Sequence, residues 1–157
     1  MKIKIGITDA HLKSSISILS SVLANEMTFF FFFIKFHWNV SGPSFMELHK
    51  LFEAQYTEVE VSIDETAERI SKLGGKAIGT MKEFSELTVI KESPNKYPEQ
   101  KEMLKELVED HETIIVQLRK DIDTCDEENK DAGTADFLTA LMKGHETMAW
   151  MLRRYLE

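Results

Sequence analysis

Five consecutive phenylalanines, residues 29–33, lie within a long stretch of helix-forming sequence and limit the folds open to this chain. Successive residues of an α-helix point about 100° apart, so these five rings surround the helix. A helix that is apolar on every side must be buried on every side. We therefore expect this helix to pack inward on its own domain and outward on a second subunit.

A membrane could also bury such a run, but the flanking residues argue against one. A spanning helix needs about 20 predominantly apolar residues. Here Asn25 and Glu26 precede the run, while Lys35 and His37 follow it. The opening residues, MKIKIGITDA, lack the apolar segment and cleavage site of a secretory signal. The sequence predicts a soluble, cytoplasmic protein without a membrane span.

Length and composition indicate one domain that covers residues 1–157. Its 43% hydrophobic content can fill a sizeable core. The single cysteine, Cys125, cannot form an internal disulfide, and we interpret it as an incidental thiol near a helix end. The net charge of −8 argues against a general nucleic-acid-binding surface, which requires clustered positive charge.

Capping and turn residues divide the chain into four long helical segments. The third segment is preceded by a long linker, residues 76–97, which we expect to contain a short helix around MKEFSEL. Four helices with one long connection predict an all-α four-helix bundle with a crossover between the second and third helices. The expected long helices are residues 10–38, 43–75, 98–127 and the remainder after DEENKDAGT.

The second helix carries two stripes of side chains. Residues that repeat at helical spacing share one face, and the apolar members of this helix form a core stripe. Beside it lies a stripe of imidazole and carboxylate groups, which are metal-ligating side chains. The core stripe is Leu48, Phe52, Val59, Ile63 and Ile70, and the second stripe is His49, Glu53, Asp64 and Glu68.

The second stripe is too long to surround one ion within a single chain. His49 and Asp64 are fifteen residues apart, which is about 22 Å along a helix. The pairs His49/Glu68 and Glu53/Asp64 nevertheless share one midpoint. A two-fold axis through that midpoint would set His49 opposite Glu68 of the partner subunit and would create two mixed sites per dimer.

His37 is expected to complete each site. The short NVSGP connection turns the second helix back along the first, so that His37 and His49 should lie at the same level. Two imidazoles and carboxylates suit Fe(II), and Zn(II), Mn(II) or Co(II) share this ligand chemistry. Acids such as Glu60 lie on the same face outside the symmetry, so a solvated helix surface is the alternative reading.

A conventional di-iron bundle uses Glu-x-x-His on two helices of one chain. That pattern is missing here, because the residues three positions before His49, His111 and His145 are Met46, Val108 and Met142. We therefore interpret His11, His111 and His145 as structural or exposed.

The sequence resembles the Dps branch of the ferritin superfamily, the miniferritins. The similarity lies in FHWNVSGPSFMELHKLFEAQYTEVEVSIDETAERISKLGG and in GTADFLTALMKGHETMAWMLRRYL, and it extends over essentially the whole chain. The resemblance implies a ferritin-like bundle and a hollow dodecamer with ferroxidase sites between two-fold-related subunits. The ligands carried over by position are His37, His49, Asp64 and Glu68, with Glu53 where the family often has Asp.

The resemblance also implies a reaction, in which Fe(II) is oxidised, preferentially by hydrogen peroxide, and ferric mineral is stored inside the shell. Such a protein is an iron-storing ferroxidase that protects against oxidative stress. Trp38, beside the site, would supply or trap an electron, or else anchor the helix end. Acids of the stretch DIDTCDEENKDAGTAD line three-fold pores in the family, and Asp131 and Asp136 are the candidates here, with a solvated turn and helix caps as the alternative reading.

DNA compaction is the alternative function, since many relatives use a mobile lysine-rich tail. Only Lys2 and Lys4 precede the first expected helix, and the last expected helix reaches Glu157 without a basic extension. We therefore expect DNA binding to be weak or absent. An oligomer with silent metal sites is a third possibility.

Overall fold

The computed structural model describes residues 3–157 and confirms an all-α fold, with no strand among those residues. Four long helices form the bundle, and a short helix lies in the crossover. The last turn of α4 continues as a π-helical segment, Thr124–Glu128. The helices are α1 (Asp9–Asn39), α2 (Phe45–Lys72), α3 (Met81–Leu87), α4 (Gln100–Asp123) and α5 (Ala132–Arg153).

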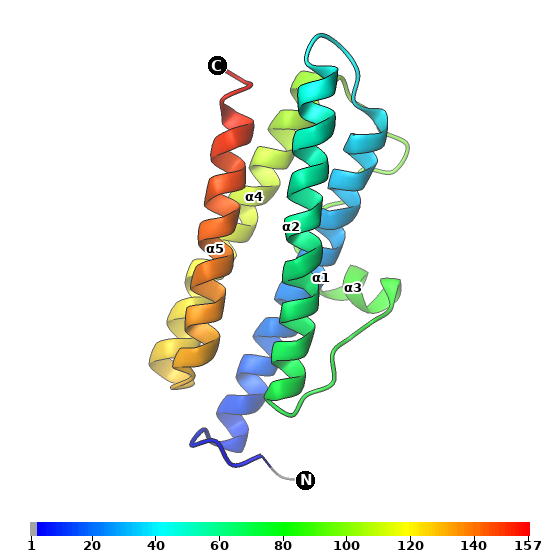
Figure 1. Ribbon diagram of the computed structural model, residues 1–157. Coiled ribbons are helices and arrows are strands. Elements are labelled where there is room, and N and C mark those ends of the chain that lie inside the picture. Colours follow the sequence, from blue (N-terminus) through cyan, green and yellow to red (C-terminus); the bar gives the residue numbers. More distant parts are fainter. Residues whose placement is uncertain (1–2) are drawn as a thin grey trace.

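The bundle is built from two antiparallel pairs, α1 with α2 and α4 with α5 (Figure 1). Helices α2 and α4 run in the same direction, so the connection between them must travel the length of the bundle. This connection carries α3 along the outer side of α1 (Figure 1). The long crossover with a short helix is therefore confirmed.

Local capping explains most helix ends. The Thr8 side chain accepts a hydrogen bond from the His11 amide and begins α1. At the end of α2, Gly74 adopts a φ of +86°, and its amide and that of Gly75 donate to Ser71 and Ile70. The predicted starts at residues 43 and 98 are each two residues early, because Pro43 lies in the turn before α2 and Pro98 precedes Glu99, the extended N-cap residue of α4.

The crossover is fastened to α1 by polar contacts. The Asn25 side-chain oxygen accepts hydrogen bonds from the Val89 amide at 2.8 Å and the Thr88 hydroxyl at 3.1 Å. Further along α1, the Lys35 ammonium donates to the Ser93 carbonyl oxygen at 2.9 Å. These bonds hold the crossover against the side of α1 that faces away from the bundle.

This covering changes the explanation of the phenylalanine run. Phe29, Phe32 and Phe33 are buried within their own chain, and Phe30 is partly buried. Only Phe31, at 38%, counts among the exposed residues of the run. The crossover therefore covers much of the outer side of the run within the chain, and packing of this helix on a second subunit stays a prediction.

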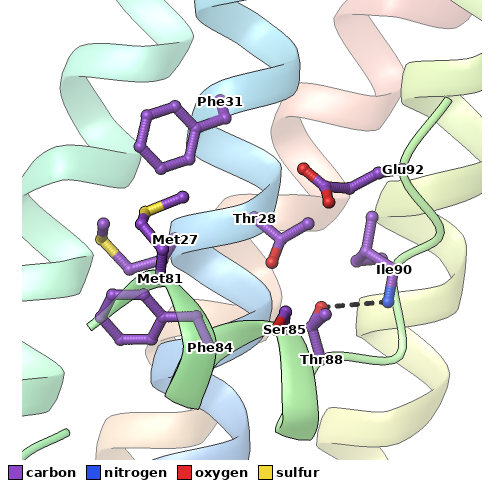
Figure 2. Close-up of a pocket in the computed structure, with 9 residues that line it drawn as sticks. All are labelled: Met27, Thr28, Phe31, Met81, Phe84, Ser85, Thr88, Ile90 and Glu92. Atoms are coloured by element: carbon purple, nitrogen blue, oxygen red, sulfur yellow. Dashed lines mark hydrogen bonds between the residues drawn. The ribbon is translucent and has the colours of Figure 1, made fainter. Parts of the chain in front are cut away.

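Phe31 borders a hollow between α1 and α3, which Figure 2 shows in close-up. The cavity has a volume of about 220 Å³, and Met27, Met81 and Phe84 supply much of its apolar lining. None of the predicted metal ligands lines it. Of the phenylalanine run, Phe31 is therefore the side chain that remains exposed, beside α3.

Helix α1 is long and apolar enough to cross a membrane, with a mean hydropathy of 1.6 over its most apolar window. The charged residues that flank the phenylalanine run therefore do not by themselves exclude a membrane span. In the structure 56% of that window is buried, and α1 is a core helix of the bundle.

The acidic segment between α4 and α5 is partly internal. Cys125 is buried, and desolvation raises the pKa of its thiol to about 11, so it is a poor nucleophile. Asp131, only 1% exposed, caps α5 through the Thr134 amide and pairs with Arg69 at 3.1 Å. The Asp131 carboxylate is thus already bonded within the chain, which contradicts the prediction that it lines a pore. Asp136 is exposed.

Candidate metal site

His37 and His49 form a pair across the α1–α2 turn. Their rings are stacked, with centroids 3.8 Å apart and planes 15° from parallel. His37 Nδ1 donates to the His49 carbonyl oxygen at 2.8 Å, and His49 Nδ1 donates to the His37 carbonyl oxygen at 3.0 Å. Each imidazole is thus held by the backbone of the other, and both residues are partly buried.

These reciprocal bonds determine the tautomer of both rings. A carbonyl oxygen can only accept, so each Nδ1 must carry the proton. In the neutral imidazole, Nε2 then keeps its lone pair and is free to bind a metal ion. Ligating histidines in proteins are oriented in this way by hydrogen bonds on the opposite ring nitrogen.

The predicted carboxylates do not approach this pair within the chain. Glu53, Asp64 and Glu68 are all exposed on α2, and Glu68 forms an ion pair with Lys72 at 3.0 Å. Across residues 3–157 there is no group of three or more His, Cys, Asp or Glu side chains that could hold a metal ion. One chain therefore offers two oriented imidazoles and, farther along α2, a row of unburied acids.

Aromatic rings enclose the histidine pair on both sides. Phe45 stacks on His49 with centroids 5.2 Å apart, and Tyr56 meets His37 edge to face at 5.4 Å. Tyr56 was not among the predicted site residues, although it lies seven positions after His49 and so on the same side of α2. Trp38 is 76% exposed and takes no part in these ring contacts.

His111 and His145 form a separate cluster in the bundle core. His145 Nε2 lies 2.8 Å from the Glu26 carboxylate, and the Nδ1 atoms of His145 and His111 are 2.9 Å apart. All three side chains are fully buried. The structural reading of His111 and His145 is confirmed. Glu26, set in the apolar stretch before the phenylalanines, was the signal that an internal partner existed.

This core cluster is poorly suited to cationic groups or ligands. Burial lowers the pKa of His111 well below its ordinary value, and nearby His145 and Arg153 lower it further. The ring of Phe29 packs on His111, with centroids 4.6 Å apart. Most of the cluster's nitrogen and oxygen atoms are already used in bonds among its own members.

Comparison with known proteins agrees with this architecture. The family model for the ferritin-like domain matches residues 16–157. An uncharacterized low temperature-induced protein of Nostoc sp. PCC 7120 is 42% identical over 156 residues, which cover 99% of this chain and 87% of that protein. DNA protection during starvation protein 2 of Bacillus anthracis is 39% identical over 145 residues, covering 92% of this chain and 97% of its own length.

Solved structures give the same result. DpsC from Streptomyces coelicolor superimposes with a TM-score of 0.96 at 29% sequence identity, and the match covers 100% of this chain and 91% of that one. The likeness includes the crossover with its short helix, because it extends over the full length of this chain.

Proposed function

Because the chain belongs to the Dps family of ferritin-like proteins, we propose that it is a ferroxidase that oxidises Fe(II), preferentially with hydrogen peroxide, and stores the ferric product. Its substrates are the iron ion and the peroxide, and it acts in the cytoplasm as a hollow dodecamer. It thereby removes both reactants that would otherwise generate hydroxyl radicals.

The observation that carries this proposal is the pair of histidines with free Nε2 atoms. His37 and His49 are locked by each other's backbone, so no side chain competes for their lone pairs. Such a preorganised pair lowers the cost of ordering the ligands when a metal ion binds. Two imidazoles need anionic ligands beside them to favour Fe(III), and the exposed acids of α2 provide these in trans.

The proposed site takes His37 and His49 from one subunit and Asp64 and Glu68 from its two-fold neighbour. Glu53 belongs to the same ligand row and would bind a second iron ion. Isologous pairing of α2 with its copy brings these groups together, since the two ligand pairs share a midpoint on the helix.

Peroxide takes up two electrons when its O–O bond breaks, so two Fe(II) ions at one site supply one electron each. Two protons from solvent complete the two water molecules that form. The carboxylates stabilise the ferric products because hard anionic oxygen ligands favour the higher charge. Exposed acids such as Asp136 would draw Fe(II) towards the shell, which is an electrostatic and salt-dependent effect.

Protection of DNA would follow from iron removal and not from contact. The net charge of −8 opposes binding to phosphate groups.

Site sharing can be tested with two inactive variants, His49→Ala and Asp64→Ala. Each alone damages every site and should oxidise Fe(II) slowly. When the two are co-refolded at equal amounts, a site is intact wherever a chain that retains His49 meets a neighbour that retains Asp64. Random mixing should restore about a quarter of the wild-type sites, measured as ferric absorbance after peroxide addition.

A mixture of His37→Ala and His49→Ala is the matched control. In the proposed site both imidazoles come from one chain, in which their rings are in direct contact, so every mixed site lacks one of them. This mixture should show no rescue. Mixed shells of the first pair that assemble fully yet remain inactive would contradict sharing between chains.

A further inference from the structure

Glu68, one of the predicted metal ligands, already has a cationic partner within the single chain. The Lys72 ammonium lies 3.0 Å from Glu68 Oε2, and the two residues are about one helical turn apart on α2. An iron ion bound to Glu68 would be repelled by this ammonium group, because like charges a few ångströms apart repel each other. Lys72 therefore has to leave Glu68 when iron binds there.

The neighbouring cation on α2 is directed elsewhere. Arg69 follows Glu68 in the sequence. Its guanidinium donates hydrogen bonds to the Asp131 carboxylate and to the Thr134 hydroxyl, each at 3.1 Å. Lys72 is instead the last residue of α2, and its side chain is 63% exposed. The ammonium can therefore move away from Glu68 without leaving a buried charge unpaired.

The proposed two-fold pairing of α2 offers Lys72 a second position. The axis that sets Glu68 opposite His49 of the partner subunit also sets position 72 opposite position 45, because the two pairs share one midpoint. Phe45 is 40% exposed, and its ring stacks on His49 with centroids 5.2 Å apart. The face of an aromatic ring attracts an ammonium group. Lys72 thus has a place beside the site once it has released Glu68.

We infer that Lys72 sets the metal affinity and the charge selectivity of the site by occupying Glu68 when no metal ion is bound. This inference rests on the proposed function. In the proposed dimer the acids of two chains face each other, with Glu53 opposite Asp64 of the partner subunit. The ammonium of Lys72 offsets part of their repulsion while the site is empty, and Fe(II) replaces it.

The charge of the entering ion decides whether this exchange is favourable. Fe(II) carries two positive charges and gains more attraction from the carboxylates than the ammonium loses. A monovalent cation gains no charge by replacing Lys72, so the ion pair selects against it. Exposed ion pairs change an equilibrium constant by a factor of about 1.5 to 5. Lys72 therefore adjusts the affinity of the site and does not create it.

The test is the binding of Co(II) to the assembled, metal-free protein, followed by visible absorption at low ionic strength. Lys72→Gln should bind Co(II) about 2–5-fold more tightly than the wild type, because the competing charge is gone. Lys72→Arg keeps the charge and should bind as the wild type does. The gain in Lys72→Gln should shrink in about 0.5 M salt, since salt screens exposed charges.

The matched control is Lys82→Gln, which removes one exposed lysine whose partner, Glu86, is also four positions away but lies on α3. Its Co(II) affinity should equal that of the wild type. Equal affinities in the wild type and Lys72→Gln, weaker binding by Lys72→Gln, or the same gain in both Gln variants would overturn the inference. Wild-type protein whose Co(II) binding does not depend on His49 would overturn the proposed function, and this inference with it.

Discussion

The chain contains two pairs of neighbouring histidines whose surroundings give them opposite chemistry. His37 and His49 are partly buried, and their Nδ1 atoms bond to backbone carbonyl oxygens. His111 and His145 are fully buried, and their Nδ1 atoms bond to each other. In the first pair each Nδ1–H donates to a backbone carbonyl oxygen, and Nε2 keeps its lone pair. In the second pair the two imidazoles bond to each other and His145 bonds to Glu26, while His111 Nε2 and Glu26 Oε2 have no hydrogen-bond partner.

The difference shows that the neighbours of an imidazole decide what it can do. A histidine held by main-chain oxygen keeps Nε2 available for a ligand. A histidine held by another side chain in an apolar core becomes part of the fold, because unpaired buried polar groups are costly. The bundle centre, where a conventional di-iron site would lie, is therefore occupied by a polar structural cluster, and the proposed iron chemistry moves to the surface of the bundle.

The largest expected loss of stability comes from removing His145, which lies between Glu26 and His111 in the core cluster. His145→Ala leaves the buried Glu26 carboxylate without its partner and should lower the free energy of unfolding by about 3–5 kcal/mol. His49→Ala, at the partly buried pair, should cost about 1 kcal/mol or less while abolishing iron oxidation. Urea denaturation followed by circular dichroism, at one fixed protein concentration, compares the two variants. Equal losses of stability would remove the distinction between the pairs.

A smaller change in stability is expected at acidic pH. Because burial lowers the pKa of His111 in the folded chain, the unfolded chain binds more protons as the pH falls below about 6.5. The contribution of His111 to stability should therefore be constant above that pH and fall below it, by up to about 1.4 kcal/mol per pH unit. Melting temperatures of the wild type and of His111→Gln, measured between pH 8 and pH 5, test this, because the variant should gain stability relative to the wild type as the pH falls. An unchanged slope in that variant would assign the acid sensitivity to other groups.

The smallest expected change in stability concerns Asp110. Its dependence on pH is opposite to that of His111. Desolvation, with lesser contributions from Glu106 and Glu109, raises the pKa of its carboxyl to about 7. The folded chain therefore holds a proton there that the unfolded chain releases near pH 4. Stability from this group is present below pH 4 and lost as the pH rises to about 7.

Asp110→Asn should consequently stabilise the protein by about 1 kcal/mol at pH 8 and change it little at pH 4. Thermal melts at the two pH values measure the difference. Glu112→Gln serves as the control, because its carboxylate is exposed and pairs with Arg153 on the surface. A uniform shift at both pH values for Asp110→Asn would contradict the raised pKa.

The sequence by itself determined the helices and the approximate level at which His37 meets His49. Caps such as Thr8 and stops such as Gly74 act through neighbouring residues, and helical periodicity identifies which side of α2 is buried. The NVSGP turn is short, so its geometry constrains the two histidines closely. These features depend on local interactions, and local interactions can be inferred from a sequence.

Only the tertiary structure decided which segment covers the phenylalanines and which side chain pairs with the Glu26 carboxylate. The covering segment reaches α1 through bonds such as Asn25 to Val89, and Glu26 meets His145 from the far end of the chain. The path of a long crossover and the register of two distant helices depend on how the whole core packs. The hydrogen bonds of the two Nδ1 atoms could not be predicted from the sequence either. The spacing of His37 and His49 shows that their rings lie near each other, but it does not show which nitrogen of each ring is left free.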